Sequence, residues 1–110
     1  MPTSILICDD SSMARKQIAR ALDPAWGVEV MFAKDGAEGL SMLRKARPAL
    51  MLLDLTMPVM DGFDVLKAMA AEGLDIPVVV ISGDIQPDAR RRVKALGALE
   101  FIKNRSTASF

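Results

Sequence analysis

Five short apolar runs, separated by segments of helical periodicity, constrain the fold of this chain more than any other feature. The runs cover residues 4–8, 28–33, 49–53, 76–81 and 99–103. Apolar stretches of this length are typical of strands that are buried on both faces of a sheet. Because each run but the last is followed by a helical pattern, we predict an α/β fold. Its five-stranded parallel sheet should be doubly wound, with right-handed crossovers and helices on both faces.

The four intervening segments show the signals of amphipathic helices. Within residues 14–22, apolar positions recur three or four residues apart, with basic side chains on the other side. Asp35, followed three residues later by Glu38, resembles a capping box that opens the second helix. We predict a third helix from Asp61 that stops at Gly73, and a fourth that starts near Pro87 and ends at Gly97.

The composition limits the chain to one small domain and excludes several kinds of chemistry. Its 110 residues are 51% hydrophobic and 25% charged, the balance of a single globular domain. Fourteen basic and fourteen acidic residues cancel, so we expect neither nucleic acid nor a membrane as a direct partner. Cys8 is the single cysteine and histidine is absent, which excludes an internal disulfide and the commonest general base. The single cysteine and the lack of a signal sequence or of a membrane-length apolar segment together favour the cytoplasm.

Polar residues follow four of the five predicted strands. In an open parallel sheet these strand ends meet at one edge, where ligands bind. The residues concerned are Asp9 and Asp10 after the first strand, Asp54 after the third, Ser82 and Gly83 after the fourth, and Lys103 and Asn104 after the fifth. Of three carboxylates so close together, one would take up a proton unless a cation compensated for the charge. Oxygen ligands without imidazole or thiolate favour Mg²⁺ as that cation. Such a site suits phosphoryl transfer, with Asp54 as the nucleophile.

Each of these residues also has an ordinary structural interpretation. Asp9 and Asp10 are able to cap the first helix, Asp54 to stand in a turn, and residues 82–84 to form a loop. Their joint occurrence at the ends of consecutive strands favours one shared site.

Four motifs carry a resemblance to a known family. They are the acidic pair at 9–10, DLTMPVMDG at 54–62, ISGD at 81–84 and GALEF at 97–101. In order and spacing they resemble the receiver domain of two-component response regulators, of which the chemotaxis type is the simplest. The resemblance covers residues 4 to about 103 and implies a flavodoxin-like strand order, 2-1-3-4-5.

The resemblance implies a role for each residue of the acidic site. Asp54 would accept a phosphoryl group from a histidine kinase or a phosphotransfer protein. The metal carboxylates fall on Asp9 and Asp10, and the direct Mg²⁺ ligands would be Asp10, Asp54 and the backbone carbonyl of Thr56. The family's signalling switch falls on two further residues, the phosphoryl-contacting Ser82 and Phe101. In the family, this switch reshapes the surface of the fourth helix and fifth strand, which binds a downstream output protein or domain.

The end of the fifth strand departs from the family pattern. The family has a lysine three residues after the aromatic residue, followed by a proline after a cis peptide bond. Here these positions hold Asn104 and Arg105, and Lys103 comes one residue early. Because strand side chains alternate between faces, we expect Lys103 to point away from where Asn104 points, and to reach the phosphate only after a local slip.

We expect residues 1–104 to form the receiver domain and residues 105–110 a short polar tail, either the end of a truncated protein or non-native. The family's last helix would then be missing, and a homodimer or a swapped segment would cover the exposed apolar surface. The main hypothesis is a switch that catalyses its own phosphorylation and dephosphorylation, and not an enzyme with a diffusible product. One alternative is an interaction module that Asn104 has decoupled from phosphorylation. Another is a phosphohydrolase with an aspartate nucleophile, which is disfavoured because Thr56 replaces the expected acid.

Overall fold

Five strands alternate with four α-helices in the computed structural model of the chain, which describes residues 3–22, 24–83 and 87–103. The elements, in chain order, are β1 (Ser4–Cys8), α1 (Ser12–Ala21), a 3₁₀ helix η1 (Pro24–Trp26), β2 (Glu29–Ala33), α2 (Gly36–Ala46), β3 (Leu50–Leu53), α3 (Gly62–Glu72), β4 (Val78–Ser82), α4 (Ala89–Ala95) and β5 (Glu100–Lys103). Asp84 and Asn104–Phe110 lie outside the described residues.

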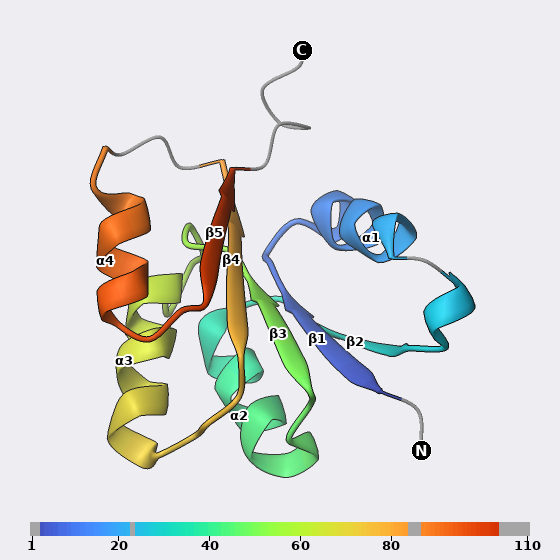
Figure 1. The fold of residues 1–110 in the computed structure, drawn as a ribbon, viewed down its shortest axis with the longest axis horizontal. Coiled ribbons are helices and arrows are strands. Elements are labelled where there is room, and N and C mark those ends of the chain that lie inside the picture. The colour runs from blue at the N-terminus through green and yellow to red at the C-terminus, as the bar shows by residue number, and fades with distance from the viewer. Residues whose placement is uncertain (1–2, 23, 84–86, 104–110) are drawn as a thin grey trace.

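All strand pairs are parallel and the order is β2-β1-β3-β4-β5, as predicted (Figure 1). In register, Cys8 of β1 stands opposite Ala33 of β2 and Leu53 of β3, while Ser82 of β4 stands opposite Lys103 of β5. The carboxyl ends of the central strands therefore lie at one edge of the sheet, where the chain next places its polar residues.

The two faces of the sheet are covered unequally. On one face, α2, α3 and α4 pack over the larger core cluster, which includes Leu6, Met51 and Val80. On the other face, α1 is the only α-helix among the described residues, and its cluster is built on Ile5, Ile7 and Leu52 (Figure 1). The β4 and β5 residues on this second face stay partly exposed, because no helix of the described ranges lies over them.

One predicted boundary is wrong by two residues. The fourth strand begins at Val78 and not at residue 76, because Pro77 has no N–H to continue the ladder. This strand extends to Ser82, which is therefore part of the sheet edge. The fourth helix begins at Ala89, after Asp88, and Pro87 precedes it.

The predicted cap of α2 is confirmed, and α3 has a cap of the same kind. The side chain of Asp35 accepts a hydrogen bond from the N–H of Glu38, and that of Asp61 from the N–H of Asp64. The Glu38 carboxylate completes the box one residue earlier than usual, on the N–H of Lys34. These bonds satisfy donors that a helix otherwise leaves unpaired at its start.

Two glycines allow close approaches between helices and neighbouring backbone. A Cβ at Gly36, the first residue of α2, would clash with the carbonyl oxygen of Met60, and a Cβ at Gly62 with that of Asp54. The first residue of α3 therefore presses directly on the backbone of Asp54. No helix in the described ranges has the length and apolar character of a membrane span.

Candidate functional site

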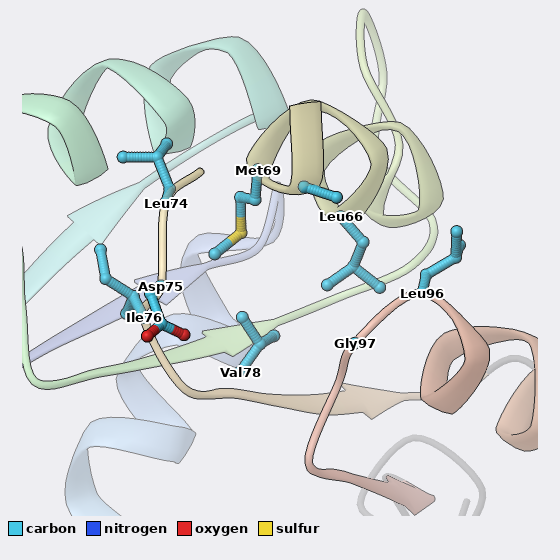
Figure 2. A pocket seen from close by; sticks show the side chains of 9 residues that line it. Leu66, Met69, Leu74, Asp75, Ile76, Val78, Leu96 and Gly97 are labelled. Carbon is cyan, nitrogen blue, oxygen red and sulfur yellow. The ribbon is translucent and has the colours of Figure 1, made fainter. Parts of the chain in front are cut away.

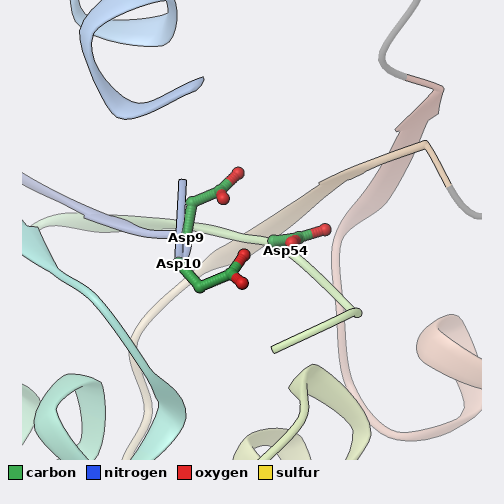
Figure 3. A group of neighbouring side chains, drawn as sticks. All are labelled: Asp9, Asp10 and Asp54. Carbon is green, nitrogen blue, oxygen red and sulfur yellow. The ribbon is translucent and has the colours of Figure 1, made fainter. Parts of the chain in front are cut away.

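Three carboxylates gather at the carboxyl edge of the sheet (Figure 3). One oxygen each from Asp9, Asp10 and Asp54 lies within 4.8 Å of the others. Asp9 and Asp10 directly follow β1, and Asp54 directly follows the neighbouring β3. The structure thus brings together the three acidic residues that the sequence placed at one site.

The sheet itself fixes the backbone of this cluster. The N–H of Asp9 donates to the carbonyl oxygen of Ala33 at 3.0 Å, and that of Asp54 to the carbonyl oxygen of Cys8 at 2.9 Å. These bonds continue the β1–β2 and β1–β3 ladders one residue beyond the strands. Both aspartates are consequently held as rigidly as strand residues, which suits a site that acts by positioning.

Burial and mutual repulsion oppose the charge on this cluster. The pKa of Asp54 is raised to about 6, first by burial and then by the neighbouring charge of Asp9. The main-chain N–H groups of Thr56 and Leu55 and the hydroxyl of Ser82 act in the opposite direction. Because the pKa values of Asp54 and Asp9 are both raised, the electrostatics of this site favour a bound cation.

Asp9 is the most enclosed of the three, with 5% of its surface exposed, whereas Asp10 is exposed. Burial raises the pKa of Asp9, and Asp10 adds to this, while a hydrogen bond from the N–H of Ser11 lowers it. That bond measures 2.9 Å, and the Arg15 guanidinium donates to the Asp9 carbonyl oxygen at 2.6 Å. Ser11 also caps α1 through its side chain, so neither aspartate serves as the cap.

The donor set fits a hard divalent cation. The cluster offers carboxylate oxygens from Asp9, Asp10 and Asp54, and Thr56 lies close enough for its N–H to interact with Asp54. The nearby thiol of Cys8 is a poor competitor. It is buried, it lies 3.3 Å from the carbonyl oxygen of Asp35, and its pKa is raised to about 12, first by burial. Oxygen ligands without a thiolate match Mg²⁺ better than zinc.

Ser82 joins the site from β4. Ser82 is only 1% exposed, and its hydroxyl hydrogen-bonds the Asp54 carboxylate. The sequence placed Ser82 after the fourth strand, but it is the last residue of β4. A movement of this hydroxyl would therefore act on the sheet edge itself.

Lys103 lies at the end of β5, opposite Ser82, and its side chain is exposed. None of the ion pairs among the described residues involves Lys103. By strand alternation it shares a face with Phe101 two residues earlier. Asn104, the residue at the family's lysine position, lies outside the described residues, so the predicted divergence of these two side chains stays a prediction.

Phe101 occupies an inward position. It is 7% exposed and belongs to the larger core cluster, and the Arg90 guanidinium lies 5.7 Å from the centre of its ring. Arg90 also approaches Glu100 at 3.3 Å, as does Lys94. The basic face of α4 is therefore tied to β5 beside the predicted switch residue.

Sequence reasoning missed Arg15 as a part of this site. Its guanidinium contacts the backbone of Asp9 and, by its charge, lowers the pKa of that carboxyl. Its position, six residues after Asp9 and one turn beyond the Ser11 cap, would have predicted this contact. A side chain there reaches back over the start of α1.

The comparisons with known proteins agree with this geometry. A family model described as the response regulator receiver domain matches residues 5–108. A protein-glutamate methylesterase/protein-glutamine glutaminase of Koribacter versatilis is 39% identical over 104 residues, which are 92% of this chain but only 28% of that protein. The chain thus spans less than a third of this relative.

Solved structures of chemotaxis proteins are also similar. Chemotaxis protein CheY4 of Vibrio cholerae is 31% identical with a TM-score of 0.82, covering 94% of this chain and 87% of its own. A CheX–CheY complex with BeF₃ and magnesium from Borrelia burgdorferi matches at 26% identity with a TM-score of 0.86, over 98% of this chain and 84% of the other.

One expectation is overturned by these comparisons. We expected the chain to be a switch and not an enzyme, but the curated relatives are named as enzymes, methylesterases and glutaminases. The sequence provided no signal of an enzyme, because its motifs resemble those of a regulatory domain. The similarity also leaves most of each relative unmatched.

Proposed function

This chain belongs to the response regulator receiver family, and on that premise we propose that it is a phosphorylation switch in which Asp54 accepts a phosphoryl group from a histidine kinase or phosphotransfer protein. The observation that carries the proposal is the cluster of three carboxylates with the Ser82 hydroxyl bonded to Asp54. An acceptor oxygen, a hydroxyl donor and a cation site at one rigid edge are the parts that phosphoryl transfer needs.

The transfer would proceed by direct attack. An Asp54 oxygen forms a bond to phosphorus while the bond from phosphorus to the donor histidine nitrogen breaks, and the nitrogen keeps the bonding electron pair. The N–H of Thr56 and the hydroxyl of Ser82, which already contact the Asp54 carboxylate, would donate to phosphoryl oxygens as negative charge shifts onto them. Mg²⁺, held by Asp9, Asp10, Asp54 and the Thr56 carbonyl, would supply the neutralising charge.

The test is a covalent phosphorylation assay. With acetyl phosphate and Mg²⁺, intact-mass spectrometry should show the gain of one phosphoryl group, because a small acyl phosphate is able to replace the protein donor. The gain should vanish in Asp54→Asn and persist in the control Asp64→Asn, whose carboxylate is exposed on α3. An unmodified wild-type protein, or equal labelling of Asp54→Asn, would contradict the proposal.

The alternative of a decoupled interaction module rests on Asn104 at the family's lysine position. In that case, beryllofluoride with Mg²⁺ would bind at Asp54 without changing the surroundings of Phe101. NMR shifts of the Phe101 ring, compared between free and beryllofluoride-bound protein, distinguish a coupled switch from a decoupled module. The predicted phosphohydrolase remains the weakest candidate, because Thr56 stands two residues after the nucleophile.

The names of the curated relatives favour a second candidate, the receiver part of a protein-glutamate methylesterase. Phosphorylation of Asp54 would then regulate ester hydrolysis by a separate catalytic region. Methanol release from methyl-esterified protein glutamate, measured on the longest protein that contains this segment, should rise with phosphorylation. Asp54→Asn should abolish the rise but not the basal rate, and an equal response in both proteins would refute this candidate.

The proposed partners follow from the same role. They are a phosphoryl donor at the acidic edge and an output protein or domain on the surface of α4 and β5, where Arg91 is exposed. A single cysteine, buried as a thiol, fits action in the reducing cytoplasm.

A further inference from the structure

A cavity of about 170 Å³ lies away from the carboxylate cluster, between α3, the segment entering β4, and the turn from α4 to β5. Its lining includes Val78, the first residue of β4, whereas the acidic cluster adjoins Ser82, the last residue of that strand. The cavity and the phosphoacceptor site therefore stand at opposite ends of one strand, and neither shares a residue with the other.

The deep wall of the cavity is apolar. Leu66 and Met69 point from α3 towards the side on which Val78 lies (Figure 2), and all three are at most 4% exposed. Leu96 and Gly97 contribute from the turn after α4. An enclosed cavity of about 150 Å³ holds a benzene ring; here the space is open on one side, and the apolar surface left for a ligand comes from the partly buried Leu74, Ile76 and Leu96. The space thus fits one small ring or branched alkyl group and excludes a nucleotide or a folded peptide.

A negative charge stands at the rim of this apolar space. Asp75 lines the cavity and is exposed, and no ion pair or hydrogen bond joins its carboxylate to another of the described residues. The acidic residues of the described ion pairs are instead Glu72 and Glu100. An apolar interior with one unpaired carboxylate at its mouth complements a molecule with an apolar body and a cationic end.

We propose that this cavity binds a small organic cation, an aryl- or alkylammonium ion, with its apolar group against Leu74, Ile76 and Leu96 and its ammonium beside Asp75. This binding goes beyond the proposed phosphoryl transfer and does not depend on it. It needs no part of the acidic cluster.

The place of the cavity gives such a ligand a route to the α4 surface. α4 has seven residues and no side-chain hydrogen bond at its N-cap, Asp88. It is tied to β5 by the exposed pairs of Arg90 and Lys94 with Glu100, and to α3 by Arg92 over the Phe63 ring. A ligand that bridges α3 and the α4–β5 turn would favour the present position of α4. Any change that moves α4 would reciprocally weaken the ligand.

Methyl NMR on the protein labelled at methionine methyl groups tests the site directly. Benzylammonium should shift the Met69 methyl signal in a saturable way, because that side chain lines the cavity and would sense the ring current of a bound ring. Met13, 68% exposed on α1, is the internal control and should not shift. Benzyl alcohol, the neutral analogue of similar shape, should bind more weakly. Parallel unsaturable shifts of Met69 and Met13, or equal affinity for the two compounds, would overturn the proposal.

Two variants separate the charge from the apolar space. Asp75→Asn should weaken benzylammonium binding about twofold to fivefold and leave benzyl alcohol binding unchanged, as for an exposed ion pair. The matched control, Glu29→Gln on the exposed part of β2, should change neither. Ala70→Leu, which fills the cavity from an exposed position of α3, should abolish the Met69 shift with both compounds. If Asp75→Asn behaves like Glu29→Gln, the cation site is refuted whether or not the cavity-filling variant folds.

Discussion

At the scale of single residues, Val59 has the least favourable backbone conformation in the described chain. Its φ is +69°, and the N–H of Met60 donates to the carbonyl oxygen of Pro58 at 2.7 Å, which closes a three-residue γ-turn. A β-branched side chain at positive φ is strained. Val59 is 86% exposed, so packing does not compensate for the strain. The loop that follows Asp54 thus holds Val59 in a backbone conformation that valine disfavours.

Val59→Gly should therefore stabilise the protein. Removing the strained Cβ is worth about 1–2 kcal/mol, from which the greater freedom of glycine in the unfolded chain subtracts roughly 0.5–1 kcal/mol. We expect a small net gain in the free energy of unfolding, measured by urea denaturation. Val59→Ala, which keeps the Cβ but not the branch, is the control and should gain less. A loss of stability in Val59→Gly would show that the turn is not strained.

Asp54 gives a second prediction at this scale. Its pKa in the folded state, about 6, lies above the ordinary value of 3.8. Between these values the folded state holds a proton that the unfolded state has released, so this group reduces stability as pH rises through that range. In chelator-treated protein at pH 7.5, Asp54→Asn should raise the free energy of unfolding by about 1 kcal/mol, after a discount for its partial exposure.

The gain should shrink below pH 4, where both states are protonated, and Mg²⁺ should raise the wild-type stability more than that of Asp54→Asn. Urea denaturation at pH 7.5 and pH 3.5, with Glu29→Gln as the control for loss of an acidic charge, measures both effects. An Asp54→Asn protein that is less stable than wild type at pH 7.5 without metal would contradict this electrostatic account.

At the scale of elements, one contact between two side chains holds α4 to α3. The Arg92 guanidinium lies 4.1 Å from the centre of the Phe63 ring on α3, and this contact joins the two helices on the outer surface. Arg92→Ala should lower the free energy of unfolding by about 0.5–1 kcal/mol, the usual worth of an exposed cation–π contact. Arg91→Ala, an exposed neighbour without a described ring contact, should change it less. Equal effects in the two variants, measured by thermal and urea denaturation, would assign the loss to helix propensity alone.

The elements show where sequence reasoning succeeds and where it ends. The caps at Asp35 and Asp61 were predictable, because a cap depends on residues three apart in the chain. The contact of Arg92 with Phe63 was not predictable, because it depends on how α4 packs against α3. We predicted that Ser82 would follow the fourth strand, because the apolar run ends at residue 81. In the structure Ser82 belongs to β4, because it pairs with Lys103 of β5.

At the scale of the whole molecule, the alternation of apolar runs was sufficient to predict the parallel sheet and the convergence of Asp9, Asp10 and Asp54. Backbone topology alone brings strand ends together, so this part of the site needed no side-chain detail. The burial that separates Asp9 from Asp10, and the reach of Arg15 over Asp9, required the packed structure.

The unequal covering of the sheet yields a prediction for the whole molecule. Ile102 is 49% exposed, and Val79 and Ile81 are only partly buried on the side where α1 is the sole helix described. We expect a second copy to cover this apolar surface, giving dimers at high protein concentration in sedimentation equilibrium. Ile102→Lys should shift the protein towards monomer, whereas Lys103→Ala should not. A wild-type protein that stays monomeric at millimolar concentration would contradict the prediction.

The contact of Gly62 with the backbone of Asp54 has a consequence for how this protein tolerates change. A side chain at position 62 would push on the residue that bears the acceptor carboxylate, without touching that carboxylate. Random mutagenesis selected for phosphorylation should therefore find position 62 nearly as intolerant as position 54, although glycine has no chemical part in the reaction. Asp64, exposed in the same first turn of α3, should accept most replacements.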